Sequence, residues 1–223
     1  MAKILIVDDT EESRWGMVSV LRRAGHDVTE QSRIRNGLRA IEEAERMGTP
    51  FEIVVVDLRF DNEQAGLPQA ELDGARRSPE TAGMIIVERA MRSRFTETIV
   101  CTAYPSLETV TEGLRLGIYR YIQKGMRSSD DSGNNTGSQF NDQLLDAVDE
   151  AVTARQIMVQ LDEGLKDLMA LTPSGSSQAS LLQPQAEQML ALWETVCQTR
   201  GRNMLAAVAN AVERATEDRR RKR

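Results

Sequence analysis

Short apolar runs alternate with amphipathic stretches through the first 127 residues. An almost unbroken apolar run such as Phe51–Val56 predicts a buried parallel strand. Apolar residues three or four positions apart, as at Trp15, Val18 and Leu21, predict a helix with one buried face. The predicted strands are Lys3–Val7, Asp27–Ser32, Phe51–Val56, Thr98–Thr102 and Tyr119–Gln123, and the predicted helices are Glu11–Ala24, Ile34–Met47, Thr81–Arg94 and Ser106–Leu116. This alternation predicts an α/β fold with a doubly wound, five-stranded parallel sheet.

The second half of the chain has a different pattern, in which polar segments separate helical stretches. Residues 58–80 and 125–140 are predicted to be long loops, because both are polar and rich in turn-forming residues. A helical pattern begins at Asn141 and continues to the C-terminal part of the chain. We therefore expect an α/β domain over residues 1–155 and an all-α module with a basic tail over residues 156–223.

Composition limits where the protein is expected to act. No apolar run approaches the roughly 20 residues that a membrane span needs. The start Met1-Ala2-Lys3 leads directly into a predicted strand and lacks a signal-peptide cleavage site. Cys101 and Cys197 are far apart and have no metal-ligand spacing, as expected in a reducing compartment. We therefore expect a cytoplasmic protein with no membrane partner.

Charge is distributed unevenly along the chain. The net charge is −6, but residues 128–218 carry 5 basic and 14 acidic side chains, a net charge of −9, ahead of five basic residues at 219–223. A module that binds nucleic acid through its phosphates usually has a basic face, so this acidic body argues against such binding. Only four of the 28 basic residues are lysines. A lysine in a defined place, such as Lys124 after a predicted strand, is therefore a candidate for specific chemistry.

Polar side chains follow four of the predicted strands directly. They are Asp8 and Asp9, Asp57, Thr102, and Lys124. Ligands of open parallel sheets bind at the carboxyl ends of the strands, so we expect these side chains to converge at one edge. Carboxylate oxygens suit Mg²⁺, and a lysine with a hydroxyl suits an anionic group. The pattern predicts phosphoryl transfer to Asp57, a reaction that depends on alignment and charge neutralisation.

Four motifs in this order are similar to the receiver domain of two-component response regulators. The motifs are residues 4–9 (ILIVDD), 54–58 (VVVDL), 100–103 (VCTA) and 121–124 (YIQK). The resemblance covers residues 1–127, with a final receiver helix expected near 141–155. It implies a flavodoxin-like fold and a signalling protein. Such a protein is not an enzyme in the usual sense, because it catalyses only its own phosphoryl transfer and slow autodephosphorylation.

The resemblance also implies a role for each matching residue. Asp57 would accept a phosphoryl group from a sensor histidine kinase or a phosphotransfer protein, assisted by Thr102 and Lys124. The Mg²⁺ ligands would be Asp8, Asp9, Asp57 and the backbone carbonyl of Arg59. Thr102 and Tyr121 would form the switch pair, and Arg59 and Tyr104 would modulate the lifetime of the phosphoryl group.

Three departures from the family pattern are visible. Gly125 stands after Lys124, where the family usually has a proline. The loop after Asp57 is longer than usual, and Gly83 stands where the family has the glycine of a turn. The loop before the final receiver helix is also extended. The inserted segment 61–80 could be a lid, a partner surface or a tolerated insertion, and both it and the segment 127–140 are expected to border the active-site face.

The C-terminal residues are expected to form a helical output or dimerisation module that binds a protein partner or a second copy of the chain. Two alternatives stay open. The last two helices, joined near Gly201, could form a DNA-binding helix-turn-helix. The receiver could instead be a scaffold that works without phosphate. A haloacid-dehalogenase-type phosphatase is disfavoured, because Asp57-Leu58-Arg59 lacks the second carboxylate that would act as general acid.

Overall fold

The structure, a computed structural model, describes residues 1–60, 66, 78–93, 95–103, 105–124 and 135–170. The chain divides into two compact units, Met1–Arg155 and Gln156–Arg223. Within the second unit the described residues are 156–170, which form the end of a helix. The first unit contains all of the predicted site residues.

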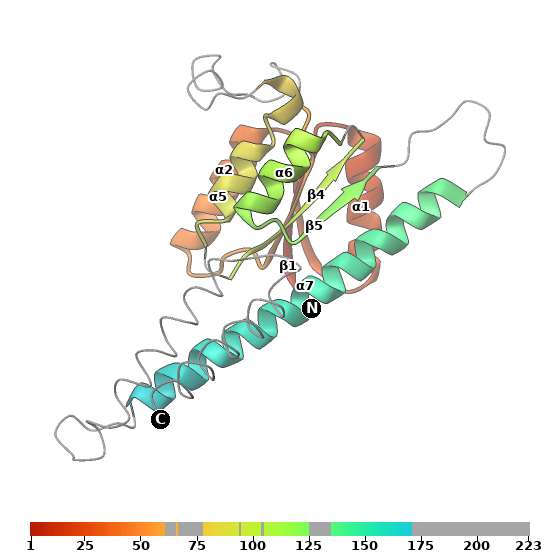
Figure 1. The fold of residues 1–223 in the computed structure, drawn as a ribbon. Coiled ribbons are helices and arrows are strands. Elements are labelled where there is room, and N and C mark those ends of the chain that lie inside the picture. Colours follow the sequence, from red (N-terminus) through yellow and green to blue (C-terminus); the bar gives the residue numbers. More distant parts are fainter. Residues whose placement is uncertain (61–65, 67–77, 94, 104, 125–134, 171–223) are drawn as a thin grey trace, which may run out of the picture. The chain divides into compact units, whose positions relative to one another are not determined.

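A five-stranded parallel sheet with the strand order β2-β1-β3-β4-β5 forms the centre of the first unit (Figure 1). Its strands are β1 (Lys3–Val7), β2 (Asp27–Gln31), β3 (Ile53–Val56), β4 (Glu97–Thr102) and β5 (Arg120–Gln123). In such sheets ligands bind where the winding direction reverses, which here is between β1 and β3. The predicted fold class, a flavodoxin-like doubly wound sheet, is confirmed.

One face of the sheet is covered by α2 (Ile34–Arg46) and α5 (Met84–Ala90). Their buried side chains share an apolar cluster with strand residues such as Leu5 and Val7. The side chains of Ile4 and Ile6 belong to a different cluster on the other face, because successive strand residues point to opposite sides. Helix α6 (Leu107–Leu116) contributes the partly buried Leu116 to the first cluster.

The other face is covered by α1 (Glu11–Arg23) and by the first part of α7 (Asn135–Ala170), as Figure 1 shows. The α7 residues in this cluster lie three or four apart and are Leu144, Ala147, Val148 and Ala151. At the end of the first unit, Arg155 Nη1 lies 2.8 Å from Glu52 Oε2 and Arg155 Nε donates to the Phe95 carbonyl at 3.0 Å. Although α7 has 36 residues, neither it nor another helix in the described ranges is apolar enough to cross a membrane.

The buried face of α1 differs from the predicted one. Trp15 is 70% exposed, whereas Met17, Val18 and Leu21 are buried. Arg14 Nη1 donates to the Asp8 carbonyl at 2.8 Å, so residue 14 is directed toward the end of β1. The next residue of a helix is rotated by about 100°, and this rotation carries Trp15 away from the core. The expectation that Trp15 shares the buried face with Val18 is wrong.

The loop predicted over residues 125–140 is too long. α7 begins at Asn135, so the second part of that segment is helical. Turn-forming residues are unfavourable in an isolated helix, but most helical stability in proteins comes from tertiary packing. Here the later turns of α7 are held on the sheet by Leu144 and the apolar residues that follow it. The prediction failed because the local composition of residues 125–140 contains no information about the packing of later α7 residues on the sheet.

The predicted loop 58–80 and the helix expected after it also need correction. Leu58 and Phe60 are 1% and 0% exposed, so the start of the segment belongs to the core. Its end forms a 3₁₀ helix, η1 (Pro79–Thr81), where a proline at the first position is favourable. The helix predicted over Thr81–Arg94 is shorter, because α5 spans Met84–Ala90. Most of the residues between Phe60 and η1 lie outside the described ranges.

His26 makes the stability of the first unit depend on pH. Its side chain is 7% exposed, and Nδ1 accepts a hydrogen bond from the Ala2 amide at 3.3 Å. Burial lowers the pKa of His26 below its ordinary value of 6.5, while the Asp149 carboxylate opposes that change. The unfolded chain therefore binds the proton more readily. The resulting stability is complete above about pH 6.5 and is lost as the pH falls toward the lower pKa of the folded state.

We expect the urea midpoint of the wild type to rise between pH 5 and pH 7, and His26→Asn to reduce that rise. Asparagine keeps a hydrogen-bond acceptor for Ala2 but does not titrate in this range. The measurement is equilibrium urea denaturation followed by circular dichroism. An equal pH dependence in both proteins would show that His26 is not the responsible group.

Candidate functional site

Four predicted site residues lie at the carboxyl edge of the sheet. Asp8 and Asp57 directly follow the central strands β1 and β3, and Lys124 directly follows β5. Thr102 is the last residue of β4, and its carbonyl accepts a hydrogen bond from the Lys124 amide at 2.9 Å. The parallel topology therefore brings together residues that are up to 116 positions apart in the chain.

Lys124 joins the two buried aspartates. Its Nζ lies 2.7 Å from Asp8 Oδ2 and 2.5 Å from Asp57 Oδ2, and the exposed fractions of the Lys124, Asp8 and Asp57 side chains are 13%, 0% and 10%. Burial alone would lower the pKa of Lys124, but the charges of Asp8 and Asp57 outweigh it and raise that pKa above its ordinary value. Lys124 is therefore a fixed positive charge at neutral pH.

Asp8 is held by residues that the sequence did not single out. Its Oδ1 accepts a hydrogen bond from the Thr10 amide at 2.9 Å, and its Oδ2 accepts one from Ser13 Oγ at 2.8 Å. Arg14 donates to the Asp8 carbonyl and, at 3.1 Å, to Glu30 Oε2. The sequence places Ser13 and Arg14 in the first turns of the helix that follows Asp8, which is a signal for such a role. The signal is not specific, because many helices carry serine and arginine in their first turns without it.

Asp57 has one carboxylate oxygen fixed by the backbone. Asp57 Oδ1 accepts hydrogen bonds from the amides of Leu58 at 2.6 Å and Arg59 at 3.3 Å. This leaves Oδ2 as the oxygen that faces Lys124. The turn is pressed against Gly83, whose amide donates to the Leu58 carbonyl at 2.8 Å. A Cβ at Gly83 would lie 1.9 Å from the Asp57 carbonyl oxygen, so only glycine fits there.

The carboxylates fit a hard divalent cation. One oxygen each from Asp8, Asp9 and Asp57 lies within 4.8 Å of the others. Two oxygens bound to the same Mg²⁺ lie at most about 4 Å apart, so small side-chain rotations would complete the approach. Lys124 supplies one positive charge to the two buried carboxylates that it contacts, and a divalent cation would neutralise the remaining negative charge of these two groups. Asp8, Asp9 and Asp57 are therefore the residues that would hold Mg²⁺.

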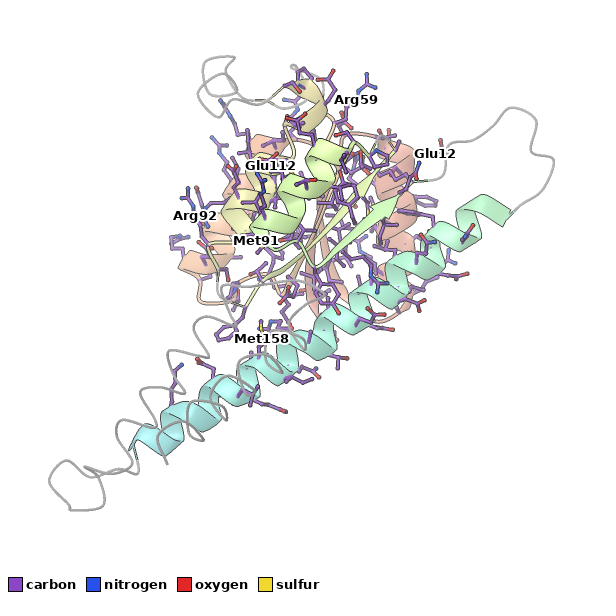
Figure 2. The ribbon with its side chains drawn as sticks, in the orientation of Figure 1. Glu12, Arg59, Met91, Arg92, Glu112 and Met158 are labelled. Atoms are coloured by element: carbon purple, nitrogen blue, oxygen red, sulfur yellow. The ribbon has the colours of Figure 1, made fainter. Side chains whose placement is uncertain are left out.

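Of the other predicted residues, Thr102 is buried at the same edge, whereas Tyr121 and Arg59 are more exposed. Thr102 is 1% exposed at the carboxyl edge. Tyr121 is half-buried on β5, and its hydroxyl donates to Thr109 Oγ1 at 3.1 Å. Burial raises the pKa of Tyr121, although the hydrogen bond to Thr109 acts to lower it. Arg59 is exposed, and Figure 2 shows its side chain directed away from the sheet. Tyr104 and Gly125 lie outside the described residues.

Cys101, the residue before Thr102, does not act as a nucleophile in this site. Its side chain is fully buried in the core cluster under α1 and α7. Burial raises the pKa of the Cys101 thiol to about 12, so the thiol is protonated at neutral pH.

Comparison with known proteins gives a result at the level of the fold. No family model matches the chain, and no curated protein matches it in sequence. A CheY-like response regulator receiver domain protein from Methanospirillum hungatei JF-1 matches 70% of this chain and 97% of its own, at 20% identity and a TM-score of 0.51. NtrX from Brucella abortus matches 78% of this chain and 35% of its own, at 17% identity and a TM-score of 0.51.

At these identities the likeness shows a shared fold. The chain therefore has the fold of a CheY-like response regulator receiver domain, as its motifs predict. The helical segment beyond residue 155 is consistent with an extension of that domain.

Proposed function

We propose that this protein is a response regulator controlled by phosphorylation. In this proposal Asp57 accepts a phosphoryl group from a sensor histidine kinase or a phosphotransfer protein. The observation that supports it best is the contact of Lys124 Nζ with both Asp8 and Asp57, at the edge where Asp9 also lies. A lysine shared by two buried carboxylates fits a site that takes up a divalent cation together with an anion.

The geometry of Asp57 fits a nucleophile. Its Oδ2 would form the bond to phosphorus, while the bond from phosphorus to the histidine nitrogen of the donor breaks and leaves its electron pair on nitrogen. Lys124 would then exchange its contact with Oδ2 for one with a phosphoryl oxygen, as a compact cation can. Bound Mg²⁺ would supply charge neutralisation at the phosphoryl oxygens. The backbone amides on Oδ1 would keep the carboxylate oriented throughout.

The response to the phosphoryl group would be a shift between two conformations. The acyl phosphate would carry a charge of about −1.5 to −2 where the Asp57 carboxylate carried −1, and it would add three acceptor oxygens. Thr102 would bind a phosphoryl oxygen, Tyr121 would move with it, and Arg59 and Tyr104 would modulate the lifetime of the modified state. The coupling would be a change in the relative populations of two arrangements of this edge.

The output would be helical association. Residues 156–223 would bind a protein partner or a second copy of the chain as a homodimer, and the protein would act in the cytoplasm. It would catalyse only its own phosphoryl transfer and slow autodephosphorylation. Binding of DNA by the last two helices is the alternative, which the net charge of −9 over residues 128–218 disfavours. These helices lie outside the described residues.

We expect acetyl phosphate with Mg²⁺ to add one phosphoryl group to the wild-type chain and none to Asp57→Asn. Asparagine keeps the size of the side chain but cannot form the acyl phosphate. The measurement is intact-mass spectrometry of both proteins after the same incubation, with and without EDTA. Removal of Mg²⁺ should reduce the modification of the wild type strongly, because the surplus charge of the carboxylates then repels the donor.

Asp27→Asn is the matched control, because Asp27 is an exposed aspartate at the opposite, amino end of the sheet. It should be modified as the wild type is. No modification of the wild type by acetyl phosphate, together with no binding of beryllofluoride, would leave the phosphate-independent scaffold. Modification of Asp57→Asn would assign the acceptor to another residue.

A further inference from the structure

Tyr121 is tied to α6 by a hydroxyl contact that the proposed function does not include. Its phenol hydroxyl donates to Thr109 Oγ1 at 3.1 Å across 12 residues of sequence. Thr109 is the third residue of α6 and is 5% exposed. The contact therefore connects β5 to the first turn of the helix that precedes it in the chain.

The Thr109 hydroxyl uses its full hydrogen-bonding capacity in this arrangement. It accepts from Tyr121 and, at 3.1 Å, from the Ser106 amide, and it lies 3.0 Å from both the carbonyl and Oγ of Ser106. A hydroxyl has one hydrogen to donate and two lone pairs. Because the group is buried, loss of the Tyr121 contact would leave a lone pair with poor access to water. Movement of Tyr121 away from Thr109 therefore has a free-energy cost.

The same hydroxyl caps α6. Ser106 precedes the helix, and its Oγ accepts a hydrogen bond from the Thr109 amide at 3.1 Å, while the Ser106 amide donates to Thr109 Oγ1. This reciprocal arrangement is a capping box with threonine in the place of the usual Glu or Gln. The capped turn carries Leu107, which is 85% exposed. A movement of Tyr121 would therefore disturb the helix start and the exposed Leu107 side chain.

We propose that Thr109 is a positioning residue that fixes the orientation of the Tyr121 ring and couples its movement to the first turn of α6. This inference rests on the proposed function, in which Tyr121 moves when Asp57 carries a phosphoryl group. A hydrogen bond present in only one of two states stabilises that state. Breaking the Tyr121–Thr109 bond therefore changes the balance between the two states and, with it, the affinity for a phosphoryl group.

The test compares five variants with the wild-type full chain. Thr109→Val removes the hydroxyl and keeps the shape, Thr109→Ser restores a hydroxyl, and Tyr121→Phe removes the other partner of the bond. The matched control is Thr111→Val, because Thr111 is an exposed threonine of the same helix whose hydroxyl donates to the Leu107 carbonyl at 2.7 Å. The fifth protein, Thr109→Val/Tyr121→Phe, closes a double-mutant cycle.

The first readout needs no phosphoryl mimic. The chain has three tyrosines, so ring ¹³C–¹H NMR signals of specifically labelled tyrosine can be assigned by substitution. We expect Thr109→Val to shift the Tyr121 ring signals, whereas Thr109→Ser and Thr111→Val leave them near the wild-type positions. Unchanged Tyr121 signals in Thr109→Val would overturn the proposal, because the ring would then not depend on that hydroxyl.

The second readout is the affinity for beryllofluoride in the presence of Mg²⁺. We expect Thr109→Val to change the affinity for the mimic by roughly three- to tenfold relative to the wild type, the effect of removing one typical hydrogen bond from one of the two states, and an unchanged affinity would contradict the coupling. The effect of Thr109→Val should largely vanish in the Tyr121→Phe background. Equal effects in both backgrounds would assign the change to loss of the helix cap and overturn the coupling.

The two proposals fail in different ways. A wild-type chain that binds no beryllofluoride contradicts the proposed function, while the ring signals still test the contact of Thr109 with Tyr121. A wild-type chain that binds the mimic, with additive effects in the cycle, contradicts only the role of Thr109.

Discussion

Replacing Lys124 with methionine is expected to lower the free energy of unfolding by about 3 kcal/mol in Mg²⁺-free buffer at neutral pH. Methionine keeps most of the apolar stem but removes the charge that lies between the Asp8 and Asp57 carboxylates. Both carboxylates are buried, so they would be left without their neutralising partner. The measurement is equilibrium urea denaturation of the wild type and Lys124→Met in the presence of EDTA.

Mg²⁺ should stabilise Lys124→Met more than it stabilises the wild type. The variant site would hold three carboxylates with no ammonium, so its attraction for a divalent cation is stronger, and binding to the folded state raises stability. Phosphorylation by acetyl phosphate should nevertheless decrease at least tenfold, because the cation that binds the phosphoryl oxygens is missing. The combination of tighter Mg²⁺ binding and weaker phosphorylation separates a site lysine from a purely structural one.

Lys3→Met is the matched control. Lys3 Nζ donates to the carbonyl and Oγ1 of Thr49 at 2.7 and 3.0 Å in an exposed position, away from the carboxylate cluster. We expect a loss of less than about 1 kcal/mol and an unchanged response to Mg²⁺. A Lys124→Met protein that matches this control in stability and in phosphorylation would contradict the charge argument.

Replacing Gly83 with alanine is expected to cost about 3 kcal/mol or more of stability and to impair phosphorylation. The added Cβ would lie 1.9 Å from the Asp57 carbonyl oxygen and 2.8 Å from the Leu58 Cα. Both of those atoms belong to backbone, so no side-chain rotation relieves the clash. The turn that holds the Asp57 carboxylate must shift. The carboxylate would then lose its orientation, which should slow phosphorylation, and the shift should also destabilise the fold.

Gly16→Ala is the control for the substitution itself. Gly16 lies inside α1, and a Cβ there would have no atom within 4 Å. Alanine should stabilise this helix by about 0.5–1 kcal/mol and leave phosphorylation unchanged. Urea denaturation and intact-mass assays of both variants provide the comparison. A Gly83→Ala protein as stable as the wild type would contradict the close contact between the start of α5 and the Asp57 turn.

The fold class was predictable because the strands are nearly continuous apolar runs. Residues 53–56 (IVVV) and 4–7 (ILIV) can be satisfied only between two layers of helices, so their pattern indicates central parallel strands. Parallel strands place their carboxyl ends at one edge, which is why Asp8, Asp57 and Lys124 could be expected to meet. The observed contacts of Lys124 agree with that expectation.

Helix faces and loop lengths were less predictable. In α1 the position of Trp15 depends on the contact between Arg14 and the Asp8 carbonyl, which joins a helix to the end of a strand. In α7 the polar first turns are helical because later residues pack on the sheet. Neither cause lies in the local sequence, since each is a tertiary contact that overrides local preference.

By itself the sequence determined which polar residues follow the apolar strands. In chain order they are an acidic pair, a single aspartate, a threonine and a lysine. Those identities follow from local pattern, because strand ends in a parallel sheet have one direction. Only the tertiary structure decided which oxygen of Asp57 is tied to backbone, which residues hold Asp8, why residue 83 must be glycine, and that Tyr121 is bonded to Thr109. These features require contact distances between distant segments to be right to within a few tenths of an ångström, and such distances are set by the packing of the whole domain.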